Sequence, residues 1–317
     1  MLSPALLLST LLTLVQLNCE NLFDCRHDTL KEDTEFLPDG DMHWTRTRYW
    51  RKLNRTGQTI LSCGGEGKDW SLPDLVALCE VENDTVLTDL TRRSLLRNAR
   101  YEYIMTDSPD RRGIDVALLY SPFSFMPLHH HSIRLPALEG MKPTRDLLYV
   151  AGLTSDGDTL HIVVAHFPSR SGGEQPTRNH RIHAAQTVCA VIDSISSLSP
   201  GARIIVAGDM NDYSTDASIR LMCGKGLQDI SRNATGRNGA KGTYRYRGLW
   251  GSLDHILASA NMAACLTECF VNDMPFLLEE DSKYGGQKPK RNYSGPAYNN
   301  GFSDHLPLVA RFRLQED

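Results

Sequence analysis

Short apolar runs separated by turn residues are the feature of this 317-residue chain that most restricts its fold. The runs are rich in Val, Ile, Leu and Tyr and are bounded by Gly, Pro, Asp or Ser, a pattern typical of β-strands. We predict strands at 12–17, 75–79, 101–106, 115–120, 125–135, 147–153, 160–165, 203–207, 252–257 and 306–312.

Amphipathic stretches between these runs predict helices at 45–61, 85–98, 177–197 and 216–221. In the third stretch Ile182, Ala185, Val188 and Ile192 recur at helical spacing, and Pro176 just before it is a start signal. The two runs around the short turn at 107–114 require antiparallel pairing. We therefore predict an α/β fold with mixed sheets packed against helices.

The chain shows no internal repeat and no linker rich in Pro, Gly or Ser, so we predict a single domain over 13–317. Residues 277–302 lack an apolar period and are long for a loop; such connections are usually functional or disordered. A formal net charge of −4 argues against binding nucleic acid by bulk basicity. It leaves room for an enzyme that acts on phosphoesters, because a metal and a few Arg can supply the positive field.

The apolar segment 1–12 has about the length of a signal-peptide core, but no Lys or Arg precedes it and no small-residue cleavage site follows. If it is the remnant of an export signal, the protein is exported or periplasmic; otherwise it is cytoplasmic. The segment is too short to span a bilayer, so we expect no stable membrane insertion. The eight Cys form no C-x-x-C pair, which disfavours a structural zinc cluster.

Polar side chains capable of catalysis follow six of the predicted strands or flank them. They are Asn18 and Glu20, Glu80 and Glu82, His166, Asp209 and Asn211, Asp254 and His255, and Asp304 and His305. A single Asp or His in such a place is usually a turn, cap or packing residue. Six such places together offer carboxylates for a hard cation, amides to orient oxygens and imidazoles to move protons. This inventory predicts metal-assisted hydrolysis of a phosphoester.

The same residues lie in motifs that occur in a fixed order along the chain. The motifs are N-C-E-N-L-F-D (18–24), C-E-V-E-N (79–83), R-R-G-I-D-V-A-L-L-Y (111–120), A-H-F-P-S-R (165–170), A-G-D-M-N-D (207–212), L-D-H-I-L (253–257) and F-S-D-H-L-P-L (302–308). Together they resemble the endonuclease/exonuclease/phosphatase superfamily, which includes DNase I, exonuclease III, neutral sphingomyelinases and inositol-polyphosphate 5-phosphatases. The resemblance implies a four-layer α/β sandwich, with two mixed β-sheets face to face and helices outside.

The resemblance also implies a metal site. Glu80 resembles the principal metal-binding carboxylate of the family, and Glu20 and Asp304 resemble further carboxylates of the metal environment. Asn18 resembles the first-strand residue that completes the phosphate environment. The implied cofactor is Mg²⁺ or Mn²⁺.

The catalytic residues implied by the resemblance lie in the later motifs. Asp209 matches the residue that positions or deprotonates the attacking water, and Asn211 the residue that holds a phosphate oxygen. His305 resembles the family's catalytic histidine, oriented by the carboxylate that corresponds to Asp254. His166 matches a histidine that contacts the scissile phosphate or leaving group in the DNase I-like and sphingomyelinase-like branches.

Several basic residues are further candidates. Arg112 precedes a predicted strand and Arg170 follows His166, so we count both as substrate-binding candidates. The basic run at 288–291 can line the mouth of the site. The His triplet at 129–131 lies in a predicted strand, where neighbours point to opposite faces. All three imidazoles therefore cannot converge on one ion, and we expect a surface feature.

The leading functional prediction is a monomeric, divalent-metal-dependent phosphodiesterase of the nuclease type, with in-line attack by a water that the metal and the Asp and His residues activate. The alternatives are a phosphomonoesterase or a lipid or inositol phosphoesterase of the same fold, and a non-catalytic module that binds phosphorylated ligands. The sequence predicts a phosphoester substrate, with nucleic acid among the candidates. No aromatic and basic stripe and no long amphipathic helix selects among these substrates.

Overall fold

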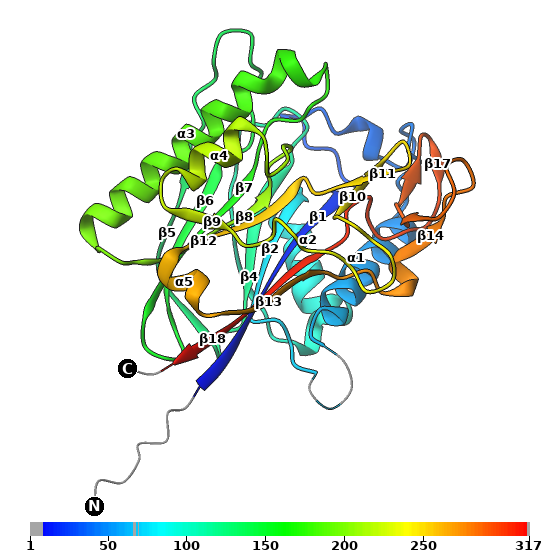
Figure 1. Ribbon diagram of the computed structural model, residues 1–317. Coiled ribbons are helices and arrows are strands. Elements are labelled where there is room, and N and C mark those ends of the chain that lie inside the picture. The colour runs from blue at the N-terminus through cyan, green and yellow to red at the C-terminus, as the bar shows by residue number, and fades with distance from the viewer. Residues whose placement is uncertain (1–8, 66–67, 69, 316–317) are drawn as a thin grey trace, which may run out of the picture.

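A computed structural model describes residues 9–65, 68 and 70–315, and these residues form two six-stranded sheets that lie face to face (Figure 1). The first sheet has the strand order β13-β18-β1-β2-β4-β3 and the second β5-β6-β7-β8-β12-β9. The strands of the first sheet are β1 (Ser9–Leu22), β2 (Leu75–Val81), β3 (Glu102–Met105), β4 (Asp115–Tyr120), β13 (Leu266–Val271) and β18 (Leu308–Gln315). Those of the second are β5 (Phe125–Ile133), β6 (Leu147–Thr154), β7 (Thr159–His166), β8 (Arg203–Asp209), β9 (Leu227–Asp229) and β12 (Asp254–Ser259).

Both sheets are mixed, as predicted. β1 and β2 run parallel in the first sheet, and β7 and β8 run parallel in the second; the other neighbours are antiparallel. The hairpin predicted around the turn at 107–114 is formed by β3 and β4.

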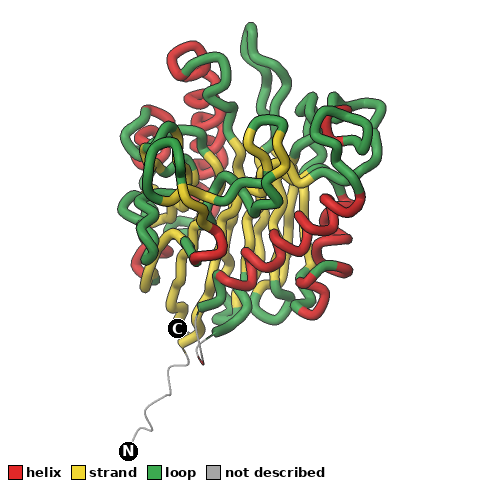
Figure 2. Tube along the Cα trace, turned by 90° about the vertical axis from the view of Figure 1, so that its right-hand side faces the viewer, coloured by secondary structure: helices red, strands yellow, loops and turns green. Residues whose placement is uncertain are grey.

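Alternation along the strands builds three apolar layers. On β1, Leu14 points between the sheets while Val15 packs on the other face against α1 (Arg46–Ser62). On β7, Val164 points between the sheets and Val163 packs toward α3 (Glu174–Leu198). Helices therefore cover both outer faces (Figures 1 and 2), and the predicted four-layer sandwich is confirmed. Each fully buried Val or Leu contributes roughly 1.5–3 kcal/mol.

Two predicted helices differ in the structure. The helix expected at 85–98 is broken into α2 (Asp84–Thr88), a π-turn η3 (Asp89–Arg93) and a 3₁₀ turn η4 (Leu95–Asn98). Ser94 interrupts it with an extended backbone, and its side chain accepts a hydrogen bond from the N–H of Leu96. α3 begins at Glu174, before Pro176, because a proline in the first helical turn removes no intrahelical hydrogen bond.

The segment at 277–302, which has no apolar period, contains two small hairpins. They are β14 (Leu278–Glu280) with β15 (Gln287–Pro289), and β16 (Tyr293–Ser294) with β17 (Ala297–Tyr298). Strands of two or three residues are too short to show a period of two. The remaining elements are η1 (Thr34–Phe36), α4 (Ala217–Cys223), β10 (Tyr244–Tyr246), β11 (Leu249–Gly251), α5 (Ala260–Ala264) and η5 (Pro275–Leu277).

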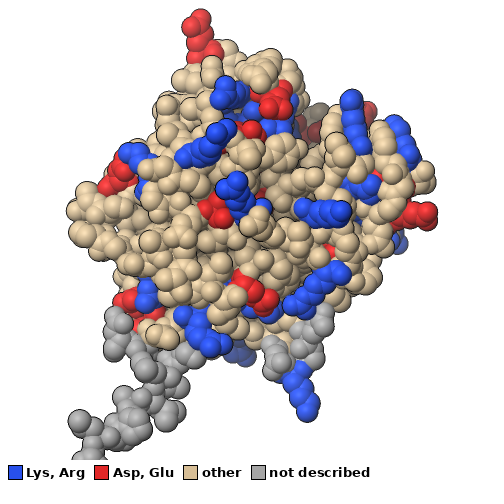
Figure 3. All heavy atoms as spheres, in the orientation of Figure 1, with Lys and Arg blue, Asp and Glu red and all other residues tan. Residues whose placement is uncertain are grey.

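The apolar segment at 1–12 lies mostly outside the described residues. Its last part, from Ser9, is the start of β1 and pairs with the end of β18. None of the helices that the structure describes combines the length and apolarity needed to cross a bilayer. On the face drawn in Figure 3, basic and acidic side chains are interspersed.

Candidate active site

The candidate site begins where the parallel strands β7 and β8 end. Their register places His166 directly beside Asp209. Gly208 permits this approach, because a Cβ at that position would lie 1.8 Å from the carbonyl oxygen of Ala165. The glycine of the G-D-M-N motif thus allows the imidazole and the carboxylate to share one end of the sheet.

Asn18 on β1 links the first sheet to Asp209. Its Nδ2 donates to Asp209 Oδ2 at 3.0 Å, and its Oδ1 accepts from the backbone N–H of Glu20 at 2.9 Å. The other oxygen of Asp209 accepts from the N–H of Asn211 at 2.9 Å, and the Asn211 side chain donates to the Phe167 carbonyl. Asp209 is therefore held at both oxygens.

Asp254 and His305 form a buried pair next to Asp209. His305 Nδ1 donates to Asp254 Oδ2 at 2.7 Å, and Thr243 Oγ1 donates to the same oxygen. Although burial alone would lower it, the pKa of His305 is raised well above its ordinary value by Asp254 and then by Asp209 and Asp304. The three carboxylates therefore favour the charged form of His305, whose Nε2 lies 3.9 Å from Asp209 Oδ2.

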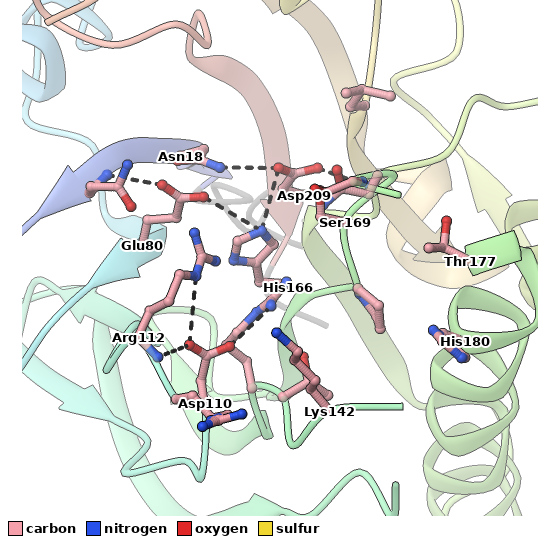
Figure 4. A pocket seen from close by; sticks show the side chains of 18 of the residues that line it. Asn18, Glu80, Asp110, Arg112, Lys142, His166, Ser169, Thr177, His180 and Asp209 are labelled. Carbon is pink, nitrogen blue, oxygen red and sulfur yellow. Dashed lines mark hydrogen bonds and ion pairs between the residues drawn. The ribbon is translucent and has the colours of Figure 1, made fainter. Parts of the chain in front are cut away.

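His166 has the opposite electrostatic state. Burial, assisted by the charges of Arg145 and Arg112, holds its pKa well below the ordinary value. Its Nε2 lies 3.7 Å from Asp209 Oδ2 and 3.9 Å from Glu80 Oε1 (Figure 4), and its Nδ1 has no hydrogen-bond partner among the described residues. The pKa values of the two imidazoles are thus shifted in opposite directions, so the two can play different roles.

Several residues around the site have left-handed backbones, which are unfavourable for side chains other than glycine. They are Glu20, Asn21, Glu80 and Asn211, with φ of 52°, 56°, 62° and 50°. At Glu20 to Asn21 and at Glu80 the β1–β2 ladder also shifts register. Such conformations cost of order 1–3 kcal/mol each and cluster at functional sites. All four of these residues line the cavity.

Glu80 is suited to bind a cation. It lies in the cavity wall with its side chain 15% exposed, and Oε2 accepts a hydrogen bond from the N–H of Asn21 at 2.9 Å. Among the described residues no Lys or Arg lies within 4.0 Å of this carboxylate, and the lowered pKa of His166, 3.9 Å away, disfavours a positive charge there. An uncompensated carboxylate oxygen facing a polar cavity is the kind of ligand Mg²⁺ and Mn²⁺ prefer.

Glu20 and Asp304 are already paired with Arg291. Arg291 Nε lies 3.2 Å from Glu20 Oε1, and its NH2 lies 3.1 Å from Asp304 Oδ2. Glu20 Oε2 also accepts from the N–H of Asn292 at 2.6 Å and lies 3.9 Å from the buried ammonium of Lys52. Burial and the charge of Asp304 raise the pKa of Glu20, and the two cations oppose this. The three carboxylates of Glu80, Glu20 and Asp304 therefore line one cavity. Arg291 offsets the charges of Glu20 and Asp304, whereas Glu80 has no such cation beside it in the described part of the chain.

The compact ligand cluster in the described chain is a different one. Asp209, Asp254 and His305 bring their ligand atoms within 4.8 Å of one another. Asp254 is already bonded to His305 and favours its charged form, whereas an imidazole must be neutral to bind a metal. This cluster therefore resembles a proton-transfer arrangement more than a metal site.

One cavity of about 640 Å³ gathers most of the residues singled out from the sequence (Figure 4). Its walls include Asn18, Glu20, Glu80, Arg112, His166, Asp209, Asn211, Asp304 and His305. Asp254 lies behind His305 and is fully buried. Glu82, His255 and Arg170 are absent from the wall, and of the basic run at 288–291 only Arg291 reaches it. The guanidinium of Arg170 pairs with Asp212 and Asp216 and lies over the Tyr213 ring.

Three residues that lack a sequence motif also build the site. Arg145 is buried, bonds to Asp110 and to the Phe167 carbonyl, and lines the cavity. The Tyr244 ring lies 4.8 Å from that of His305. Lys52, on α1, is buried and donates to the carbonyl of Phe302. The sequence marks Lys52 only by its place on the face of α1 that also carries Tyr49 and Leu53, and it gives no such signal for Arg145 or Tyr244.

Comparisons with known proteins agree with the fold. The model of the Endonuclease/Exonuclease/phosphatase family matches residues 13–313. A similar structure is an endonuclease/exonuclease/phosphatase family protein from Bacteroides thetaiotaomicron, with 15% identity, a TM-score of 0.63, and coverage of 97% of this chain and 96% of that one. A search of curated proteins finds no match.

Two further similar structures carry functional names. Truncated TDP2 from Caenorhabditis elegans has 17% identity and a TM-score of 0.58, covering 96% of this chain and 98% of that one. A mannosyl-6-phosphatase from Bacteroides thetaiotaomicron has 16% identity and a TM-score of 0.58, covering 94% and 98%. At these identities the likeness concerns the fold, whereas the family model covers nearly the whole described chain. The chain belongs to the endonuclease/exonuclease/phosphatase family.

Proposed function

We propose that this protein is a divalent-metal-dependent phosphoester hydrolase that acts on a phosphodiester. The observation that carries the proposal is the placement of two imidazoles, His305 and His166, within 4 Å of the Asp209 carboxylate in one cavity, with pKa values shifted in opposite directions. Hydrolysis at phosphorus requires an activated water, neutralised phosphoryl oxygens and a group that assists the leaving oxygen.

Glu80 would hold the Mg²⁺ or Mn²⁺, with Glu20 and Asp304 nearby. The bound ion would withdraw charge from a phosphoryl oxygen. Burial, together with the charge of Asp254, raises the pKa of Asp209, with His305 opposing, so this carboxylate is a stronger base than an ordinary Asp. We assign Asp209 to accept the proton of the attacking water.

The remaining residues would stabilise the transition state and assist the leaving oxygen. The imidazolium of His305, oriented by Asp254, would stabilise negative charge on the pentacoordinate phosphorus. The neutral His166 would donate an N–H to the phosphate or leaving oxygen, and Asn18 and Asn211 would orient Asp209 and the substrate. Arg112 at the cavity wall would attract the anionic substrate.

A phosphomonoesterase is the second candidate, favoured by the size of the cavity. A volume of about 640 Å³ is typical of a small-molecule site, and the face in Figure 3 has no broad basic surface for a nucleic acid. The mannosyl-6-phosphatase among the similar structures is consistent with this candidate.

The test is hydrolysis of bis(p-nitrophenyl) phosphate, p-nitrophenyl phosphate and plasmid DNA, each with Mg²⁺ and with EDTA. We expect Mg²⁺-dependent cleavage of the diester that is lost in His305→Ala and retained in His183→Ala, a control at a half-buried histidine of α3 that does not line the cavity. Cleavage of the monoester alone would favour the second candidate. Full Mg²⁺-dependent activity in His305→Ala would refute the assignment.

A further inference from the structure

A second group of histidines lies on β5, the edge strand of the second sheet (Figure 1). His129 and His131 are two residues apart on this strand, so their side chains share one face. They pair with Ala151 and Tyr149 of β6, whereas His130 pairs with the inward-facing Val150. None of these three histidines lines the catalytic cavity.

The two imidazoles are close enough to bind one ion. His131 Nδ1 lies 3.1 Å from His129 Nε2. Two nitrogens bound to a tetrahedral Zn²⁺ at about 2.05 Å would be about 3.3 Å apart, so only a small adjustment is needed. The expectation that three consecutive histidines cannot meet at one ion still holds, because only the alternate pair converges.

The surroundings hold the two rings in place. The Tyr149 ring lies 5.0 Å from that of His131 and 6.3 Å from that of His129. Its hydroxyl is hydrogen-bonded to His161 Nδ1 at 2.8 Å.

We propose that His129 and His131 form a binding site for a divalent transition-metal ion of the Zn²⁺, Ni²⁺ or Cu²⁺ class, separate from the catalytic cavity. Each neutral ring offers one lone pair, and the ring that donates the present N–H···N bond shifts that proton to its other nitrogen. Both side chains are exposed, so the remaining positions on the ion are open to water or to a donor from another molecule. Imidazole ligands select these ions over Mg²⁺, and Cu²⁺ should bind more tightly than Ni²⁺ or Zn²⁺.

The test is calorimetric titration of the full-length protein with Ni²⁺ in excess Mg²⁺, which occupies oxygen-ligand sites. We expect a Ni²⁺ site whose affinity falls about ten-fold or more in His129→Asn and in His131→Asn. His130→Asn is the matched control and should bind as the wild type does. Unchanged Ni²⁺ binding in the first two variants, or an equal loss in His130→Asn, would overturn the proposal. We expect all three variants to hydrolyse the phosphoester in Mg²⁺ as the wild type does, so the Ni²⁺ result does not depend on the proposed function.

Discussion

Replacing Asp254 by Asn should disable His305 while keeping the side-chain volume. Asp254 is fully buried and its Oδ2 accepts the 2.7 Å hydrogen bond from His305. Removing one partner of a buried charged pair lowers the free energy of unfolding by about 3–5 kcal/mol. A positioned acid–base group contributes about 10²- to 10⁴-fold to a rate, so we expect kcat to fall by about that factor when His305 loses its orienting carboxylate. Because Asp254 raises the pKa of His305, its loss also lowers that pKa, and activity should decline at a lower pH than in the wild type.

The assay is kcat for bis(p-nitrophenyl) phosphate in Mg²⁺ over an acid-to-alkaline series, with the free energy of unfolding measured in parallel. Asp229→Asn is the matched control, because Asp229 and His255 form another buried pair, 3.3 Å apart, that does not line the cavity. This control should lose stability but keep kcat and the pH profile. Wild-type kcat in Asp254→Asn, or an equal loss in Asp229→Asn, would refute the reasoning.

Three other predictions follow from contacts of single residues. Arg112→Ala should lower kcat/KM about 10-fold or more in steady-state kinetics, because Arg112 lines the cavity. Arg170→Ala should instead lower Tm in calorimetry with little change in KM, because Arg170 pairs with Asp216 away from the cavity. Gly208→Ala should destabilise the fold by about 1–3 kcal/mol or more in urea unfolding, because the new Cβ meets a backbone carbonyl. Burial raises the pKa of Glu82 from 4.5 to about 8, so its stabilising contribution is full below pH 4.5 and is lost as the pH rises through 8. Glu82→Gln should therefore be more stable than the wild type by about 5 kcal/mol in alkaline buffer, at about 1.4 kcal/mol for each pKa unit. Equal stability of the two proteins there would contradict the pKa shift.

The strands were predictable because burial on both faces demands apolar residues. β4 matches its prediction at both ends, and β1 differs mainly at its ends, where polar residues continue the strand into the site. The break at Ser94 could not be read from the sequence, because the apolar spacing continues through it. The short β14–β17 hairpins are fixed by tertiary contacts, such as the bonds of Arg291 and Asn292 to Glu20.

The site was predictable where polar residues interrupt apolar strands, and less so where a contact depends on side-chain direction. Glu80, Asp209 and His305 reach one cavity because the ends of β2 and β8 and the start of β18 lie on the same side. Arg170 follows His166 in sequence but turns to Asp212 and Asp216, a direction that the motif does not encode. Likewise no pattern indicated that Arg291 would lie between Glu20 and Asp304.

The central claim is that groups from both sheets form one metal-dependent hydrolytic pocket around Glu80. The most direct measurement is the Mg²⁺-induced rise in thermal stability, together with diester hydrolysis, in the wild type and in Glu80→Gln. Mg²⁺ at about 100 times its dissociation constant should stabilise the wild type by about 2.7 kcal/mol, and Glu80→Gln should lose both this gain and the hydrolysis. Glu139→Gln, an exposed carboxylate, should keep both. Retention of the Mg²⁺ response and of hydrolysis in Glu80→Gln would contradict the account.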